Sequence, residues 1–379
     1  MNVETAEKVF FVIAKSHRLK QPLSDCFVVG LLAMTTGFAA VFPVAVLAIQ
    51  DPLALIYSQR ADLQVAFDSQ TGLAIPATAA GFLLDLEDWA RQYGWMEHEE
   101  LSAYGPAEGD GVPVRVDATE IESQIDAQSY VVMDRSTGKI LTVKNENRVW
   151  PIASLTKLVT ADVVLDAGVS MSELADIRSD DDVGGAKLWV YDGDQFSVQD
   201  LFYAALVASA NNAANALSRT IGLSSEEFLM EMNARAEALN LVKTIFVDPT
   251  GIELGNVSTA REMARLAADI LERDEVAQFT STYVKYITDL TQGTTKKMTN
   301  TNWMIYKPEY DDVYVTGGKT GYLVESGWNL VVTLRPDGAD TDRELLIVLF
   351  GADSRSDSFV NAERLADWAW DVHEWQKQN

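Results

Sequence analysis

The sequence has very little cysteine or histidine. Cys26 is the single cysteine among 379 residues, so the chain cannot form a disulfide within itself or hold a metal through a cysteine cluster. The three histidines, His17, His98 and His373, leave little room for a histidine-rich zinc site. We therefore expect no metal site.

Basic residues are also scarce. The chain has 30 lysines and arginines against 56 aspartates and glutamates, a net charge of −26. So acidic a surface repels phosphate backbones, which argues against nucleic-acid partners. Hydrophobic residues make up 47% of the chain, enough for a substantial core, and its length allows two or three domains.

One long segment has no charge at all. Residues 27–49 form an uncharged apolar run of 23 residues, and a helix of that length crosses a hydrocarbon core of about 30 Å. Lys15, Arg18 and Lys20 precede it, so residues 1–26 are expected in the cytoplasm and the rest of the chain outside. We expect a transmembrane signal anchor over residues 27–49; the alternative is a cleaved signal peptide.

The exported part divides into two regions. Residues 50–122 are expected to form an acidic linker or accessory region. Phe82, Leu86, Trp89 and Tyr93 there share one face of a possible amphipathic helix. A single catalytic domain is expected over residues 123–376.

Apolar patterns predict strands at both ends of this domain and helices between them. Strands are predicted over residues 130–133, 139–143, 313–316, 329–334 and 345–349, and helices over 154–167, 198–220, 225–239, 259–271 and 359–375. Thr259 and Glu262 predict a capping box. The pattern favours one sheet assembled from both ends of the domain, with a helical insert.

The histidines do not support a Ser-His-Asp enzyme, which needs a histidine placed to take the serine proton. His17 precedes the apolar segment, His98 lies in the acidic region and His373 lies near the C-terminus. A serine enzyme with this sequence must therefore use another base.

Lys157 is a candidate for that base, because it follows Ser154 by three residues in PIASLTK. If a helix begins at Ser154, both side chains share a face, and the helix N-terminus favours negative charge developing on Oγ. A lysine acts as a base only when its pKa falls well below about 10.4, which burial and a second cation can cause. Alone, this spacing is more typical of an N-cap serine followed by a surface lysine.

Two further motifs change this interpretation. Ser209 and Asn211 in VASANN lie between apolar helical stretches, where Ser209 can relay a proton and Asn211 can hold a substrate amide. Lys319 and Thr320 in TGGKTGY lie on a strand-like run whose glycines let a substrate backbone lie close. Lys319 also supplies the second cation that could lower the pKa of Lys157. Three such motifs in this order are typical of active-serine penicilloyl enzymes.

With these motifs the chain resembles the low-molecular-mass penicillin-binding proteins, specifically the serine D-alanyl-D-alanine carboxypeptidases of peptidase family S11. The resemblance runs from about Tyr130 to Trp370 and includes PIASLTKLVTA, VASANNAA, FVDPTG, NTN, GGKTGY and LFGA. It implies an α/β (α+β) fold of the β-lactamase/transpeptidase type. In that fold an antiparallel sheet is flanked by helices, a helical subdomain is added, and the serine lies at their junction. No metal or organic cofactor is implied.

The resemblance also implies roles. Ser154 is expected to attack the bond between two D-alanines of a peptidoglycan stem peptide and form an acyl-enzyme, with Lys157 as general base. Ser209 is expected to relay a proton and Asn211 to position the substrate.

Substrate binding is assigned by the same resemblance to the third motif. Lys319 and Thr320 would hold the terminal carboxylate. Gly321 and Tyr322 belong to the same substrate-binding strand, and the backbone N–H groups of Tyr322 and Ser154 would form the oxyanion hole. β-Lactam antibiotics are expected as covalent inhibitors. The expected location is the extracytoplasmic face of a bacterial cell membrane.

Other functions stay open at this point. The middle motif reads Ser-Ala-Asn where many carboxypeptidases carry Ser-Gly-Asn. A D,D-endopeptidase that cuts crosslinks has the same motifs, as does a β-lactamase, for which Glu253 is a faint candidate for the deacylating residue. A catalytically silent, membrane-tethered wall-binding module is a further alternative.

Overall fold

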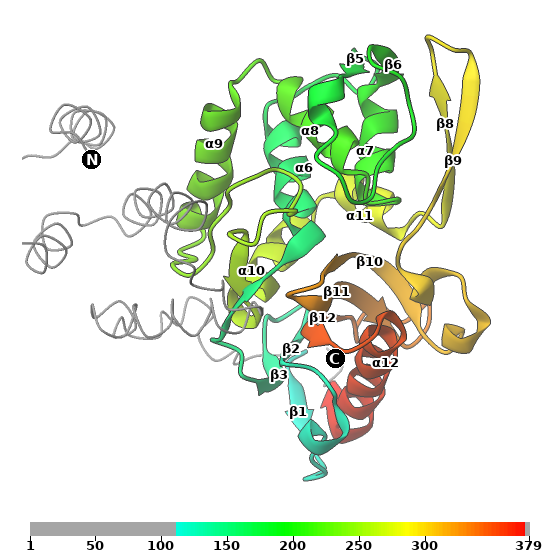
Figure 1. The fold of residues 1–379 in the computed structure, drawn as a ribbon. Helices are drawn as coiled ribbons and strands as arrows, with labels where there is room; N and C mark the ends of the chain where they lie inside the picture. The colour runs from blue at the N-terminus through cyan, green and yellow to red at the C-terminus, as the bar shows by residue number, and fades with distance from the viewer. Residues whose placement is uncertain (1–110, 376–379) are drawn as a thin grey trace, which may run out of the picture. The chain divides into compact units, whose positions relative to one another are not determined.

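The computed structural model describes residues 111–375 (Figure 1). The segments predicted as a membrane anchor over residues 27–49 and as an amphipathic helix over 82–93 lie outside the described residues. Between residues 111 and 375, no helix is both long and apolar enough to cross a membrane.

The centre of the fold is an antiparallel sheet of five strands in the order β10-β11-β12-β2-β3. Its strands are β2 (Ser129–Asp134), β3 (Ile140–Lys144), β10 (Tyr314–Leu323), β11 (Gly327–Arg335) and β12 (Leu345–Ala352). In this sheet Val131 pairs with Val348 on one side and Val143 on the other. The prediction that strands from both ends of the domain join in one sheet is confirmed.

Helices cover both faces of this sheet. Every residue of β2 and β12 is buried, which explains their continuous apolar sequences. Alternate residues such as Tyr130, Leu330 and Ile347 share a core with Phe359 and Leu365 of α12 (Arg355–Val372). The opposite face packs against α10 (Ala260–Ile270), which contacts β2 and β12.

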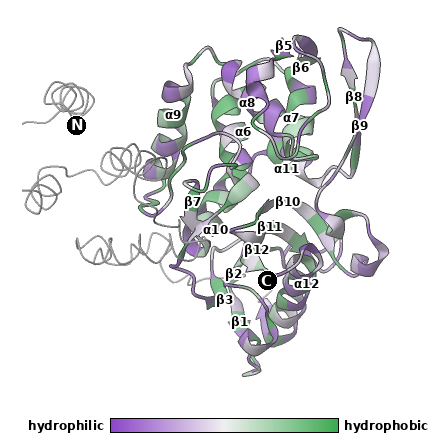
Figure 2. Ribbon diagram, viewed as in Figure 1, coloured by the Kyte–Doolittle hydropathy of each residue, from purple (hydrophilic) through white to green (hydrophobic). Residues whose placement is uncertain are grey.

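The remaining helices form the inserted subdomain above the sheet in Figure 1. They are α6 (Lys157–Asp166), α7 (Val198–Leu206), α8 (Asn211–Arg219), α9 (Ser225–Ala238) and α11 (Asp274–Ser281). Figure 2 shows both hydrophobic and hydrophilic residues on these helices, and most residues of α7 and α8 are buried. Short two-stranded ladders complete the fold: β4 (Val149–Pro151) with β7 (Val257–Thr259), and β5 (Leu174–Ile177) with β6 (Asp194–Ser197).

The prediction of one helix over residues 198–220 is wrong. The chain leaves the helix after Leu206 and begins a second one at Asn211. Ser209 lies between them with φ of 61°, a left-handed conformation that an α-helix does not contain. The interruption places Ser209 on a turn and Asn211 at the start of α8.

The predicted capping box at α10 is correct only in its first half. Thr259 Oγ1 accepts a hydrogen bond from the N–H of Glu262 at 3.1 Å. The Glu262 carboxylate, however, accepts from the N–H of Lys243 and, at 2.6 Å, from Thr244 Oγ1. The Glu262 carboxylate therefore binds the loop after α9 instead of accepting a hydrogen bond from the Thr259 N–H, as a capping box requires.

Several elements had no prediction, among them the short two-stranded ladders. A hairpin of β8 (Val284–Asp289) and β9 (Thr294–Thr299) and the helix α11 lie between the predicted elements, and β13 (His373–Trp375) ends the helix predicted to reach residue 375. β13 pairs with β1 (Pro113–Arg115). The folded unit therefore includes a strand from before residue 123, where the catalytic domain was expected to begin.

Candidate active site

Ser154 lies in a short 3₁₀ turn, Ala153–Thr156, between β4 and α6. Ala153 has φ of 51°, which is unfavourable for alanine, and its carbonyl accepts a hydrogen bond from Thr156 Oγ1 at 2.8 Å. Backbone strain of this kind persists only where the surrounding structure enforces it. The turn fixes Ser154 at the N-terminus of α6.

Lys157 is the first residue of α6, and its side chain is almost fully buried at 1% exposure. Its Nζ donates to Ser154 Oγ at 2.8 Å, to Asn211 Oδ1 at 2.7 Å and to the Thr250 carbonyl at 2.6 Å. Burial lowers the pKa of Lys157 to about 7, and the Asp248 carboxylate acts in the opposite direction. A large fraction of Lys157 is therefore neutral near pH 7, as a general base must be.

Lys319 makes a second buried pair with the Ser-x-Asn motif. Its Nζ donates to Ser209 Oγ at 2.8 Å and to the Thr320 carbonyl at 2.9 Å. The pKa of Lys319 lies well below its usual range because the side chain is buried and because Lys157 and Arg355 are also cationic.

Burial is the leading cause of the lowered pKa at both lysines. The positive charges of Lys157 and Arg355 lower the pKa of Lys319 further, whereas the Asp248 carboxylate raises that of Lys157. The influence of Lys319 on the pKa of Lys157 stays a prediction.

Gly321 allows strand β10 to lie directly against the turn that carries Ser154. A Cβ atom on Gly321 would lie 2.8 Å from the Ile152 carbonyl oxygen and 3.3 Å from the Ser154 amide nitrogen. Tyr322 comes directly after Gly321, so its main chain lies next to the turn that carries Ser154. The Tyr322 ring is half exposed and stacks on Trp328, with the ring centres 4.3 Å apart.

The structure brings Ser154, Lys157 and Asn211 into one hydrogen-bonded group and pairs Lys319 with Ser209. Thr320, the remaining predicted side chain, donates through Oγ1 to Thr301 Oγ1 at 2.7 Å. All the motif residues thus lie at the junction of the sheet and the helical subdomain.

Sequence reasoning missed Arg355 and gave no role to Thr301, which belongs to the NTN stretch. Arg355 is at the start of α12, where its Nη2 donates to the Thr301 carbonyl at 2.5 Å and its guanidinium lies 4.6 Å from the Trp303 ring centre. It adds a third cation to the neighbourhood of Lys319. No spacing connects Arg355 with the three motifs, so only the packing of α12 could reveal it.

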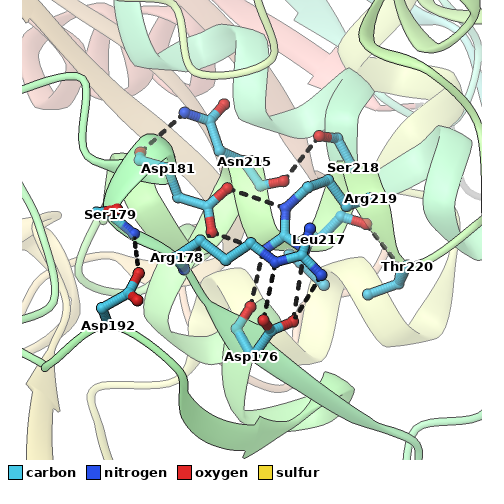
Figure 3. A network of polar contacts seen from close by, with 10 residues as sticks. All are labelled: Asp176, Arg178, Ser179, Asp181, Asp192, Asn215, Leu217, Ser218, Arg219 and Thr220. Atoms are coloured by element: carbon cyan, nitrogen blue, oxygen red, sulfur yellow. Dashed lines mark hydrogen bonds and ion pairs between the residues drawn. The ribbon is translucent and has the colours of Figure 1, made fainter.

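The loop between β5 and β6 reaches Asn211 from outside. Asn211 Nδ2 donates to the Gly184 carbonyl at 2.8 Å, and the N–H of Asn211 donates to the Ala186 carbonyl at 2.7 Å. Figure 3 shows how this loop is held: Arg219 of α8 forms an ion pair with Asp181 at 2.6 Å. The orientation of Asn211 therefore depends on an ordered loop.

Comparison with known proteins identifies the family. The model of the D-alanyl-D-alanine carboxypeptidase family, Peptidase_S11, matches residues 116–354. The chain is 31% identical to the D-alanyl-D-alanine carboxypeptidase DacF of Bacillus subtilis over 260 residues, covering 66% of this chain and 63% of that protein. It is 32% identical to a D-alanyl-D-alanine endopeptidase of Pseudomonas aeruginosa over 250 residues, covering 65% and 78%.

A solved structure agrees with the fold. Penicillin-binding protein D2 of Listeria monocytogenes in its ampicillin-bound form superposes with a TM-score of 0.56 at 26% identity. The match covers 65% of this chain and 98% of that one. The fold predicted for the described domain, an antiparallel sheet with helices, is confirmed in this respect.

Proposed function

Because the chain belongs to the D-alanyl-D-alanine carboxypeptidase family of serine DD-peptidases, we propose that it removes the terminal D-alanine from peptidoglycan stem pentapeptides. The observation that carries this proposal is the contact of 2.8 Å between Lys157 Nζ and Ser154 Oγ, made by a lysine with a pKa of about 7. A base near neutrality within hydrogen-bond reach of a hydroxyl is the arrangement that general-base catalysis needs.

Acylation proceeds in two parts. Neutral Lys157 takes the Ser154 proton while Oγ attacks the carbonyl between the two D-alanines. The oxyanion that forms is stabilised by the backbone N–H groups of Ser154 and Tyr322, since preorganised donors lower the barrier most where charge develops. Collapse of this intermediate breaks the peptide bond, and Lys157, assisted by Ser209, returns the proton to the departing amine.

Recognition of the substrate involves the cationic side of the site. The terminal carboxylate binds at Lys319 and Thr320, and the charge of Arg355 adds to their attraction. A carboxylate beside Lys319 favours its protonated form, so binding restores the charge that burial disfavours. Asn211 holds the amide of the preceding residue. Water then hydrolyses the ester on Ser154, and no metal or organic cofactor takes part.

Cleavage of peptide crosslinks is the second candidate function. It is favoured by the endopeptidase relative from Pseudomonas aeruginosa, which is as similar to this chain as the carboxypeptidase from Bacillus subtilis. Both reactions use the same nucleophile and base. They differ in the leaving amine: it is free D-alanine in the carboxypeptidase reaction and the side-chain amine of a second stem peptide in the cleavage of a crosslink.

We place the catalytic domain outside the cytoplasm, anchored by residues 27–49. The uncharged run and the preceding basic residues support this part of the proposal. Inhibition by β-lactams is expected from the same acylation chemistry. The ampicillin-bound relative from Listeria monocytogenes supports it.

A substrate comparison tests the proposed activity. Purified full-length protein is incubated with a soluble peptide ending in Lys-D-Ala-D-Ala and, separately, with a crosslinked muropeptide dimer, beside a Ser154→Ala control. We expect D-alanine release from the peptide by the unsubstituted protein alone. Monomers formed from the dimer without D-alanine release from the peptide would instead establish the endopeptidase. No product from either substrate would overturn the proposal.

A further inference from the structure

The turn after α9 is organised around one carboxylate. Asp248 Oδ1 accepts hydrogen bonds from the Thr250 N–H at 2.7 Å, the Thr250 hydroxyl at 2.5 Å and the Gly251 N–H at 2.8 Å. Its Oδ2 accepts from the Glu253 N–H at 2.9 Å and from Asn256 Nδ2. The Asp248 carboxylate thus accepts five hydrogen bonds, which fix the course of the main chain from residue 248 to 253.

The carbonyl groups of this turn point at α6, the helix that begins with Lys157. The Thr250 carbonyl accepts from Lys157 Nζ at 2.6 Å, and the Pro249 carbonyl accepts from Thr160 Oγ1 at 2.6 Å. Of the three acceptors around Lys157 Nζ, the Thr250 carbonyl is the one supplied by main chain. The turn sets the position of this carbonyl oxygen, and no side-chain rotation can change it.

The same turn also contacts the other side of the nucleophile. A Cβ atom on Gly251 would lie 1.9 Å from the Ala153 carbonyl oxygen, so the backbones of Gly251 and Ala153 are in direct contact. The turn therefore touches the residue before Ser154 and the base that follows it.

We infer that Asp248 is a positioning residue for Lys157: its carboxylate holds the 248–251 turn so that the Thr250 carbonyl fixes the lysine Nζ against Ser154 Oγ. The inference rests on the proposed function. Asp248 acts through the main chain of Thr250 and makes no hydrogen bond of its own to Lys157 among the contacts of the described residues.

The charge of Asp248 has a second consequence. Two charged groups lie near the Lys157 side chain: Asp248 on the turn, which raises the pKa of Lys157, and Lys319 on β10. Arg355 of α12 lies next to Lys319. Removing the Asp248 charge leaves burial unopposed, so the pKa of Lys157 falls further. The two effects can be measured separately in the pH dependence of the acylation rate. A displaced turn lowers the plateau rate, whereas a lower pKa of Lys157 moves the acidic limb to lower pH.

The test uses the full-length protein and measures the second-order rate of Ser154 acylation by a fluorescent penicillin between pH 5 and pH 9. For Asp248→Asn we expect the plateau rate to fall by about tenfold to a hundredfold, since a displacement near 1 Å can cost that much. We expect the acidic limb of the profile to move to lower pH by up to about one pH unit.

Two further variants keep the test decisive. Thr160→Val removes the donor to the Pro249 carbonyl without changing charge, so we expect a lower plateau with the limb unmoved. Glu237→Gln removes one negative charge from the exposed surface of α9 and should change neither feature. Should Asp248→Asn fail to fold, Thr250→Val, which removes the hydroxyl donor to Asp248 Oδ1 without changing charge, decides the positioning role by the same loss of plateau rate.

The inference is overturned if Asp248→Asn acylates like the unsubstituted protein. It is also overturned if the variant loses rate with the limb in its original place. A failure of the proposed function looks different, because the unsubstituted protein itself would then form no adduct on Ser154.

Discussion

Replacing Gly251 with alanine tests whether the contact between the 248–251 turn and the serine turn determines reactivity. The new Cβ atom would lie 1.9 Å from the Ala153 carbonyl oxygen, whereas real Cβ contacts essentially never fall below 3.0 Å. The two turns must therefore separate by about 1 Å, a displacement that can lower a catalytic rate by about a hundredfold.

The stability cost follows from the same geometry. Gly251 has φ of 82°, and alanine in this left-handed region costs about 1–2 kcal/mol. Overpacking adds about 1–3 kcal/mol, so we expect Gly251→Ala to lower the free energy of unfolding by about 2–5 kcal/mol. Both turns are anchored by buried hydrogen bonds, which limits how far the strain can relax.

The matched control is Gly222→Ala. Gly222 has a similar φ of 74°, but a Cβ atom added there would have no atom within 4 Å, so only the conformational cost of about 1–2 kcal/mol applies. Urea unfolding and the acylation rate with a fluorescent penicillin are measured for both variants. If Gly251→Ala is no less stable than Gly222→Ala and acylates at the same rate, the contact between the two turns does not matter and the reasoning fails.

Three further predictions concern the base, the core and the loop. Since Lys157 must be neutral to act and its pKa is about 7, acylation of the unsubstituted protein should fall about tenfold for each pH unit below 7; a rate that is flat between pH 5 and pH 7 would contradict this. Asp162 is fully buried between the partly exposed Arg235 and Arg273, so Asp162→Ala should lower the free energy of unfolding by about 2 kcal/mol, measured by urea titration. An unchanged free energy of unfolding would show that the two ion pairs do not stabilise the fold. Arg219→Ala should remove the ion-pair partner of Asp181 and raise amide hydrogen exchange in residues 178–193, and unchanged exchange there would contradict a role for this pair in ordering the loop.

The sequence predicted the sheet better than its surroundings. The strands around Val131, Leu330 and Val348 are continuous apolar runs because they are buried on both faces, and such runs are easy to recognise. The hairpin of β8 and β9 is rich in threonine and lysine and has no comparable pattern. The break between α7 and α8 escaped notice because the residues around Ser209 are small and mostly apolar, like those of the flanking helices, and only the backbone turns away.

Within the site, local spacing and long-range packing differ in what they reveal. Ser154 and Lys157 are three residues apart, so their contact follows from one turn of chain. The Thr250 carbonyl is main chain, and a contact made by main chain leaves no residue type to recognise. Arg355 comes close only because α12 packs on the sheet. The contacts of the Thr250 carbonyl and of Arg355 both depend on tertiary structure, which the periodicity of a sequence does not predict.

The most direct test of the account is the intact mass of the full-length protein after mixing with benzylpenicillin, followed over time beside a Ser154→Ala control. The account predicts a penicilloyl adduct that forms on the unsubstituted protein, maps to Ser154, is lost slowly and is absent from the control. Rapid hydrolysis of the drug without a lasting adduct would instead favour a β-lactamase. A folded protein that neither binds nor hydrolyses the drug would contradict the assignment of Ser154 as nucleophile.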